Sequence, residues 1–272
     1  MPKPKEIILS KIDNLPVRLS GTWIKRKHHF LQEYAKILTV GMRYKWRGRL
    51  TFIDLFAGPG SCMIEKTNEE LAGSPLLALQ HAFGCYIFVE ETTFLMNALK
   101  TRCKNFPKKL ASIKFIQADS NQCIDQIIKQ MPKDHLNLAF IDPTDIDIHY
   151  ETIRALSKAS TGVDLLMNIQ YGMDLKRNYG NYMKQGADSK LARFLGADFD
   201  RSRLKEAKDV IEIYRLRLEE LGYGTVRFRE ISVTNTKNAQ MYFLLFASKH
   251  PRGLDYWKKI SKKDEQGQEE LF

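Results

Sequence analysis

Long hydrophobic runs are missing from this sequence. No stretch of its 272 residues approaches the roughly 18 consecutive apolar residues that mark a membrane span. The first residues, MPKPKEIILSKIDNL, also lack the apolar core and the small-residue cleavage site of a signal peptide. We therefore expect a cytoplasmic protein that does not contact a membrane.

Cysteine is scarce, and the few that occur are not paired. The chain has four, Cys62, Cys85, Cys103 and Cys123, and no two of them form a CxxC motif. A chain of this length can fold without disulfides, so we expect reduced thiols. His28 and His29 lie in a basic segment and are expected at the surface, and no spacing of His, Cys, Asp and Glu predicts a metal site.

Positive charge is what the sequence has in excess, and it is unevenly placed. The 43 basic and 32 acidic residues give a net charge of +11. Residues 1–50 hold 12 basic and 3 acidic side chains, whereas residues 51–150 hold 9 and 12. Because 43% of the residues are apolar, the chain can bury a core, which excludes intrinsic disorder for most of it. The surplus indicates a polyanionic partner that docks on the front of the chain.

The front segment, residues 1–49, is predicted to be a basic helical N-terminal extension. Between Trp23 and Arg47 four apolar residues, Phe30, Tyr34, Ile37 and Leu38, recur at helical spacing, which predicts an amphipathic helix or helix pair. Three interpretations stay open: a helix that packs its apolar stripe on the core, a surface that neutralises phosphates, and a docking surface for an acidic protein. The residues that would contact nucleic acid are Lys25, Arg26, Lys27, Arg43, Lys45, Arg47 and Arg49, with Trp23 or Trp46 available for stacking.

Residues 50–272 alternate predicted strands and helices. LTFIDLFAG reads as a buried strand, and further strands are expected at 85–90, 113–117, 136–141 and 163–169, with helices at 75–83, 93–105, 121–130, 150–159 and 204–221. This alternation predicts an α/β fold with a Rossmann-like, doubly wound, mostly parallel sheet. An insertion is expected at 171–201, and an antiparallel strand pair at 225–233 and 241–248, on the C-terminal side.

A glycine-rich turn follows the first of these strands, in FIDLFAGPG from Phe52 to Gly60. Asp54 lies in the strand, and the small residues of the turn, Ala57, Gly58 and Gly60, let a ligand approach the backbone amides. Acidic residues end the next three strands: Glu90, Asp119 (followed by Ser120) and Asp142 (followed by Pro143 and Thr144). Since parallel strands end at the same edge of a sheet, we expect one acidic rim beside the turn.

This pattern resembles the class I S-adenosylmethionine-dependent methyltransferases over roughly residues 50–248. The resemblance implies that the turn with Ala57, Gly58 and Gly60 holds the methionine part of the cofactor, that Glu90 takes the ribose hydroxyls, and that Asp119 and Ser120 contact the adenine. Asp54, which precedes the turn, is also expected to bind the cofactor. It also implies that Asp142, Pro143 and Thr144 line the methyl-transfer site. NAD is the competing cofactor, but LFAGPG departs from the GxGxxG pattern of dinucleotide sites.

A narrower resemblance is to the bacterial three-Cys-motif partner proteins. It rests on FIDLFAGPG, on GSPLLAL at 73–79, on FIDP at 140–143 and on the basic aromatic helix in front. As in that family, the stretch after the glycine turn is lengthened, here at 61–72. Ser74 is expected to cap the following helix, with Pro75 in its first turn. The resemblance implies a three-Cys-motif protein as a candidate partner and does not indicate a substrate.

The loop at Asp142 to Asp145 leaves two functions open. Methyltransferases that act on base amines carry an Asp/Asn-Pro-Pro-aromatic loop, of which DPTD keeps the first two positions. No cysteine nucleophile lies on this loop, as a cytosine C5 mechanism would need, and Asn168 could orient an acceptor from the next strand. We expect a methyltransferase with nucleic acid as its acceptor. The alternative is an adaptor protein that keeps the fold and acts with a protein partner without turnover.

Overall fold

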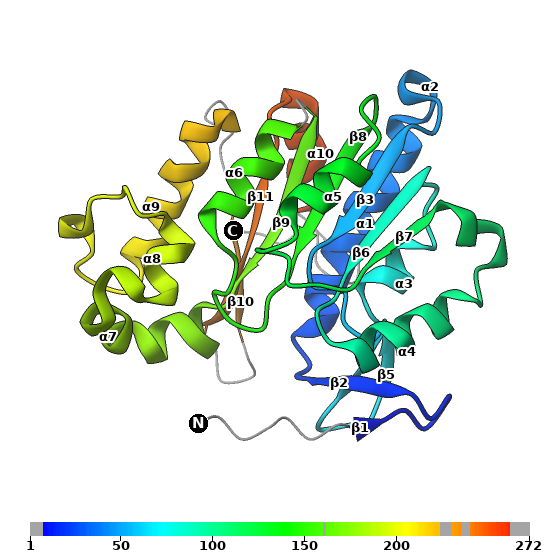
Figure 1. Ribbon diagram of the computed structural model, residues 1–272, viewed down its shortest axis with the longest axis horizontal. Coiled ribbons are helices and arrows are strands. Elements are labelled where there is room, and N and C mark those ends of the chain that lie inside the picture. The colour runs from blue at the N-terminus through cyan, green and yellow to red at the C-terminus, as the bar shows by residue number, and fades with distance from the viewer. Residues whose placement is uncertain (1–7, 160–161, 224–229, 235–239, 262–272) are drawn as a thin grey trace.

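The main sheet has seven strands among the residues described by the computed structural model, which are 8–159, 162–223, 230–234 and 240–261. Its strand order is β10-β11-β9-β8-β3-β6-β7. The strands are β3 (Leu50–Asp54), β6 (Cys85–Val89), β7 (Ile113–Ile116), β8 (Leu136–Ile141), β9 (Val163–Ile169), β10 (Glu230–Thr234) and β11 (Gln240–Ala247). Figure 1 shows this sheet at the centre of the molecule.

The sheet confirms the predicted doubly wound α/β architecture. Strands β7, β6, β3, β8 and β9 pair in parallel, and β11 lies between β9 and β10, antiparallel to both. The chain winds outward from β3 in one direction and from β8 in the other, so the topological switch point lies between these two strands. The predicted C-terminal strand pair is present, although residues 225–229 of its first strand lie outside the described residues.

Alternating residues along the strands divide the core into an aliphatic and an aromatic layer. Ile53, Ile87 and Ile141 face one layer, and their neighbours Phe52 and Phe88 face the other. The aliphatic side is covered by α5 (Ile124–Gln130), α6 (Tyr150–Ala159), α8 (Lys190–Leu195) and α9 (Asp209–Leu218), and the aromatic side by α1 (Ile24–Gly41), α3 (Ser74–Ala78), α4 (Thr93–Cys103) and α10 (Pro251–Ile260). Both faces are therefore buried, as a mostly parallel sheet requires.

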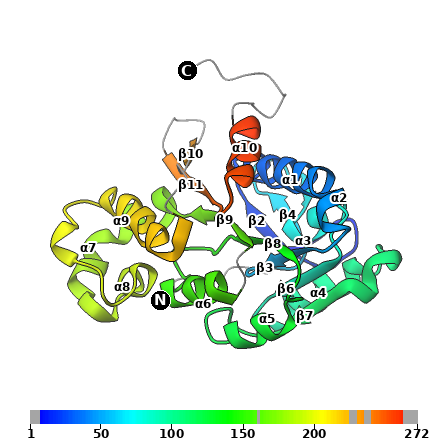
Figure 2. The same cartoon turned by 90° about the horizontal axis from the view of Figure 1, so that it is seen from above.

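The sequence predicted a helix or a helix pair in the front segment, and the structure has a pair, α1 and the short α2 (Arg43–Trp46). The apolar stripe of α1 is buried, and α1 packs beside α10 on the aromatic side of the sheet, as Figure 2 shows. Tyr34 is fully buried, packs against Phe246, and donates a 2.6 Å hydrogen bond to Asp164 in β9. The interpretation of a stripe packed on the core is therefore correct for this face of the helix.

The front segment is not helical throughout, which the sequence did not predict. Two strands precede the helices, β1 (Ile8–Leu9) and β2 (Pro16–Ser20). They form a second sheet, β1-β2-β4-β5, with β4 (Ser61–Ile64) and β5 (Glu70–Ala72) from the lengthened stretch after the glycine turn. Strand β2 pairs in parallel with β4, so a segment that precedes the main sheet in the sequence pairs with the strand directly after the glycine turn.

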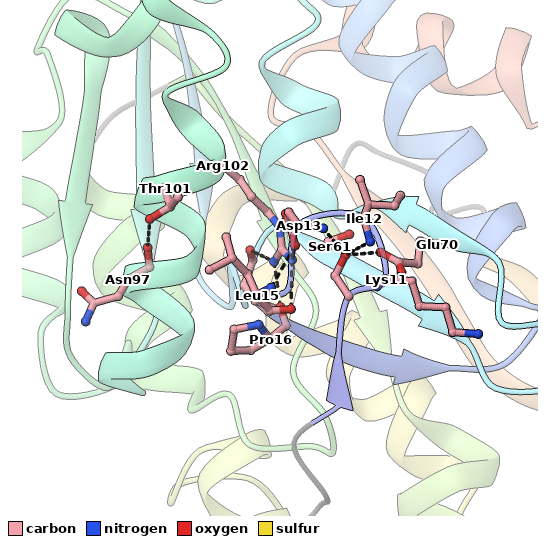
Figure 3. A network of polar contacts seen from close by, with 12 residues as sticks. Lys11, Ile12, Asp13, Leu15, Pro16, Ser61, Glu70, Asn97, Thr101 and Arg102 are labelled. Atoms are coloured by element: carbon pink, nitrogen blue, oxygen red, sulfur yellow. Dashed lines mark hydrogen bonds and ion pairs between the residues drawn. The ribbon is translucent and has the colours of Figure 1, made fainter.

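Arg102 in α4 ties this second sheet to the main domain (Figure 3). Its guanidinium is 4% exposed and binds both carboxylate oxygens of Asp13, in the loop between β1 and β2, at 2.8 Å. One nitrogen, Nη1, also donates to the carbonyls of Pro16 and Pro59, each at 2.7 Å. A single buried cation thus fixes β2 against the glycine turn, which contains Pro59.

The predicted insertion at 171–201 is largely helical, and its last helix, α8, packs against the aliphatic side of the core. A π-helical turn at Tyr171–Leu175 leads into α7 (Lys176–Gln185) and then α8. Asp174 anchors the turn, because its carboxylate accepts bonds from the Ile146 amide, Asn178 and Tyr182. The helix predicted at 204–221 is shorter, since α9 begins only at Asp209. Within the described residues no helix combines the length and the apolar character that crossing a membrane requires.

The Arg102 contacts predict that the variant Arg102→Met is destabilised by about 3 kcal/mol. The methionine keeps the apolar stem but leaves Asp13 and the carbonyls of Leu15, Pro16 and Pro59 without their cation. Urea unfolding monitored by circular dichroism measures the change. Arg154→Met, which breaks an exposed pair with Glu151, is the control and should cost no more than about 0.5 kcal/mol. Equal losses in the two variants would contradict the role of Arg102.

Candidate functional site

The four predicted acidic strand ends meet at the carboxyl edge of the main sheet. Asp54 ends β3, and Glu90, Asp119 and Asp142 follow β6, β7 and β8. In the parallel register Asp54 lies level with Phe88 and Phe140, so Glu90 and Asp142 are two residues further along on either side. The structure therefore brings the rim together as the sequence predicts.

Two cavities open at this edge. The first has a volume of about 200 Å³ and is lined by the glycine turn, by Lys27 of α1 and by Asp142 and Asn168. The second has a volume of about 330 Å³ and is lined by Glu90, Asp119 and Ser120 among others. Four residues line both cavities, namely Arg18, Phe56, Pro143 and Thr144. The cavities are therefore neighbours, separated by these side chains.

The glycine turn has a backbone that only glycine adopts without strain. Gly58 and Gly60 have φ angles of +61° and +81°. The Gly58 amide donates a 2.9 Å bond to Glu90 Oε2, which links the turn to the next strand. Gly73 packs on the turn from outside: a Cβ there would lie 3.0 Å from the Gly60 carbonyl carbon, and the Gly73 amide donates to the Gly60 oxygen. The GSP motif thus supports the turn.

Ser74 does not cap α3, contrary to the prediction. The N-cap is Gly73, and Ser74 is the first helical residue with Pro75 after it. Its side chain is buried at the wall of the first cavity, near Asp54. The hydroxyl therefore contributes to the environment of that carboxyl group.

Asp54 is a fully buried carboxyl group with one unsatisfied oxygen. Its Oδ1 accepts a 3.1 Å bond from the Phe56 amide, whereas Oδ2 has no hydrogen-bond partner among the described residues. Burial raises the pKa of Asp54 to about 7, and the charges of Asp142 and Glu90 act in the same direction. Ser74 and the Phe56 amide oppose this shift. The group can therefore gain or lose a proton near neutral pH.

Glu90 is the most heavily hydrogen-bonded acid of the rim. Besides Gly58, its Oε2 accepts a bond from Arg18 Nη2 at 3.1 Å, and its Oε1 accepts one from the Thr92 amide at 2.9 Å. In the same cavity Asp119 accepts from the Asn121 amide, and the Ser120 hydroxyl donates to the Leu55 carbonyl. The wall of the second cavity is thus a set of fixed acceptors.

Asp142 forms a buried polar cluster with two residues. Lys27 Nζ donates to its Oδ2 and Asn168 Nδ2 to its Oδ1, both at 2.5 Å. The Asn168 Oδ1 atom is buried and has no hydrogen-bond partner among the described residues. Two further contacts fix the loop: Gln170 donates to the Pro143 carbonyl at 3.2 Å, and Arg18 to the Thr144 hydroxyl at 3.3 Å. The three predicted loop residues therefore form one wall of the first cavity.

Lys27 and His28 are buried, unlike the surface groups that the sequence predicts. Lys27 is 7% exposed and points to Asp142 rather than to solvent. His28 is 8% exposed, and burial lowers its pKa to about 3, with the neighbouring charge of Lys27 adding to the shift. The imidazole is therefore neutral at physiological pH.

The other predicted nucleic-acid contacts are not gathered at the site. Arg43, Lys45 and Arg47 are exposed at α2, which precedes β3 and so lies at the opposite end of the sheet from the rim (Figure 1). Gly41, the last residue of α1, is 14 residues beyond Lys27, about 21 Å along the helix axis. The remaining three have local contacts: Lys25 pairs with Glu69, Arg49 with Asp134, and Arg26 lies over the Phe30 ring.

Cys62 lines the first cavity but is a weak candidate for chemistry. Burial raises the pKa of its thiol to about 11, so it stays protonated at neutral pH. This agrees with the expectation of a structural cysteine. Across the part of the chain that the structure describes, no three His, Cys, Asp or Glu side chains are grouped so that they could hold a metal ion.

Arg18 is the site residue that sequence reasoning missed. It lies in β2, in the unremarkable sequence PVRLS, and reaches the site only because β2 pairs with β4. A Cβ on Gly58 would lie 3.2 Å from Arg18 Nε, so the side chain crosses directly over the glycine turn. No local signal marks such a residue, because the pairing that places it is long-range.

Comparison with solved structures agrees with the topology. A protein of family DUF519 from Legionella pneumophila is 12% identical, with 86% of this chain and 89% of that chain covered and a TM-score of 0.54. The fold is class I methyltransferase-like. An O-methyltransferase from Bacillus cereus in complex with SAH is 11% identical, with 82% and 80% covered and a TM-score of 0.48. No protein-family model and no curated protein sequence matched the chain.

The raised pKa of Asp54 predicts that stability falls as the pH rises. A carboxyl whose pKa is higher in the folded state favours folding below its ordinary value near 3.8, and this contribution is lost as the pH rises through about 7. Asp54→Asn keeps an acceptor for the Phe56 amide and cannot ionise. We expect the free energy of unfolding to decline less between pH 5 and pH 8 in this variant than in the wild type.

Urea unfolding at several pH values measures this difference. Asp164, whose pKa is raised to about 6 by burial, shifts the stability in the same direction and should account for a residual decline. Asp125→Asn, at an exposed position in α5, is the control and should follow the wild type. Parallel curves for wild type and Asp54→Asn would rule out the titration of Asp54.

Proposed function

We propose that the protein is an S-adenosylmethionine-dependent methyltransferase that acts on nucleic acid. The observation that carries the cofactor assignment is the juxtaposition of the glycine turn, Asp54 and Glu90 at the switch point of a class I methyltransferase-like sheet. Ligands of such sheets bind beyond the carboxyl ends of the strands, where both cavities lie.

The side chains at the rim fit the groups of this cofactor. Glu90 offers carboxylate oxygens to the ribose hydroxyls, and Asp119 and Ser120 are available to the adenine in the second cavity. Asp54 is fully buried and lines neither cavity, so its part in this proposal is electrostatic: the positive charge of the amino group would favour its ionised form. Ala57 and Gly60 line the first cavity, where the methionine part would lie beside the backbone of the turn, and the Arg18 side chain lies over Gly58.

The cluster at Asp142 suits the acceptor side of the reaction. The cofactor supplies an electrophilic methyl group, and the protein must hold a lone pair of the acceptor in line with it. Asp142 is kept in place by Lys27 and Asn168, each carboxylate oxygen has a second lone pair, and the Asn168 carbonyl oxygen is also an acceptor. These oxygens would orient an acceptor that carries protons, and Asp142 would take up a proton released on transfer.

Charge supports nucleic acid as the acceptor class. The exposed cations at and after α2, Arg43, Lys45 and Arg47, surround Tyr44, whose side chain is 87% exposed. Cations neutralise phosphates and an exposed ring stacks on bases, which together provide sequence-independent affinity. In this proposal α2 holds the polyanion about 21 Å or more from the site that modifies it.

An adaptor function is the second candidate, and one feature favours it. After Asp142-Pro143 the loop continues with Thr144 and Asp145 instead of the proline and aromatic residue of amine-directed enzymes, and Thr144 is engaged by Arg18. A protein of this kind would bind the cofactor and a partner, with a three-Cys-motif protein as the candidate, but would not transfer the methyl group. Tight partner binding without any labelled product would favour this function.

The cofactor assignment predicts that Glu90→Ala weakens binding of S-adenosylhomocysteine at least about tenfold, because the ribose hydroxyls lose a charged acceptor. Isothermal titration calorimetry with the intact chain measures the dissociation constant. Glu65→Ala removes an exposed carboxylate after β4 and should leave binding unchanged. Absence of binding to the wild type, or equal affinity in both variants, would contradict the assignment.

The acceptor assignment predicts transfer of a labelled methyl group from S-adenosylmethionine to nucleic acid. We expect label in RNA or DNA prepared from cells and not in the protein fraction. In the triple variant Arg43→Gln, Lys45→Gln and Arg47→Gln, the salt dependence of nucleic-acid binding should become shallower by about 2 to 3 in log–log slope. Binding of S-adenosylhomocysteine should not change, because α2 lies away from the rim.

Two outcomes would reject nucleic acid as the acceptor. Label in protein or in small molecules, with none in nucleic acid, would assign a different substrate class. An unchanged salt slope in the triple variant would show that α2 does not contact the polyanion. Thermal unfolding of the triple variant serves as the control for folding, and it should match the wild type because all three side chains are exposed.

A further inference from the structure

Arg18 connects the two cavities through its guanidinium group. Its Nη2 donates to Glu90 in the second cavity and its Nη1 to Thr144 at the boundary between them. The side chain is 40% exposed, whereas that of Glu90 is 4% exposed. Arg18 is therefore the more exposed partner of a pair whose other member is buried in the wall of the site.

The acceptor positions on Glu90 are nearly all occupied. A carboxylate offers four lone-pair positions, and the Gly58 amide, the Thr92 amide and Arg18 use three of them. A ribose presents two hydroxyl donors and therefore needs two positions. Since the two amides belong to the backbone, Arg18 is the donor that can leave. A diol bound through both hydroxyls and the Arg18 contact exclude one another.

A displaced Arg18 loses its 3.1 Å ion pair with Glu90, and a carboxylate of the ligand would replace that pair. The other cation that lines the first cavity, Lys27, is already paired with Asp142, and His28 is neutral. The guanidinium already lies over Gly58 at the entrance of this cavity, so a carboxylate bound beside the glycine turn would be within its reach. Guanidinium groups bind carboxylates through two parallel bonds.

We propose that Arg18 is an exchanging counter-ion, which pairs with Glu90 when the site is empty and with the carboxylate of the ligand when a ribose takes Glu90. This inference rests on the proposed function and adds a specificity to it. A ligand that carries both a ribose and a carboxylate repays the broken Arg18–Glu90 pair, whereas a nucleoside without a carboxylate does not. The site thereby selects the intact cofactor skeleton against its nucleoside fragments.

The test compares S-adenosylhomocysteine with 5′-methylthioadenosine, which has the ribose but no amino-acid group. Calorimetry gives the ratio of their dissociation constants in the wild type and in Arg18→Met. In the variant we expect methylthioadenosine to bind a few-fold more tightly, because its ribose no longer competes with Arg18 for Glu90. We expect S-adenosylhomocysteine to bind about tenfold more weakly, because its carboxylate loses the guanidinium group. Arg18→Lys keeps the charge without the bidentate geometry and should give an intermediate ratio.

Lys11→Met is the matched control, since Lys11 is an exposed cation of the same N-terminal segment that lines neither cavity. Its ratio should equal that of the wild type. Equal weakening of both ligands in Arg18→Met would show that Arg18 only supports β2, and unchanged affinities for both ligands would show that it does not contact the ligand; either result overturns the proposal. If Arg18→Met does not fold, Arg18→Lys decides: a ratio of dissociation constants equal to that of the wild type would overturn the proposal.

The proposed function fails in a different way. If the wild type binds neither ligand, the cofactor assignment is wrong, and the exchange is excluded with it. If the wild type binds both ligands equally well, the cofactor assignment survives and only the role of Arg18 is rejected. The two hypotheses are therefore separated by the wild-type titrations alone, before any variant is measured.

Discussion

The arrangement of the site depends on the buried contact between Arg102 and the N-terminal segment. Arg102 binds the Asp13 carboxylate, the Pro16 carbonyl and the Pro59 carbonyl at once, so that β2 and the glycine turn share one cation. Because β2 also pairs with β4, the segment is held on two sides. The chain after β2 enters α1 directly, and this entry point carries Lys27 to Asp142. A segment outside the main sheet therefore completes the site.

Of the neighbouring rim acids Glu90, Asp54 and Asp142, two are paired with a cation. Glu90 is matched by Arg18 and Asp142 by Lys27, and both cations come from the N-terminal segment. Asp54, between them, has no cation, and its pKa is raised accordingly by burial and by the two neighbouring acids. A buried carboxyl in this state is stabilised by a cationic group that arrives with a ligand. The unequal pairing thus leaves one acid of the rim, Asp54, without a cation among the described residues.

The sequence predicts this fold well because its signals are local. Apolar strands that end on Asp54, Glu90 and Asp142 are short-range patterns, and the parallel sheet that follows from them brings their ends together without further information. The contacts that the sequence did not predict join residues that are far apart in the chain. Lys27 is sequentially part of a basic run and resembles its neighbours Lys25 and Arg26, but the helical phase that buries Phe30 and Tyr34 also turns Lys27 inward. Arg18 lies in a strand whose partner is more than forty residues away.

The length of α1 limits which proposed acceptors could contact both the rim and α2. This helix is 18 residues long, about 27 Å, and joins the site at its first turns to the exposed cations after its last turn. A small acceptor would fill the first cavity and never reach α2. An acceptor that contacts both ends must extend over at least the length of the helix, which corresponds to several nucleotides of a polyanion. If the proposed contact of α2 with nucleic acid exists, the proposed acceptor is a polymer, and the length of α1 sets the distance between its bound phosphates and the group held at the rim.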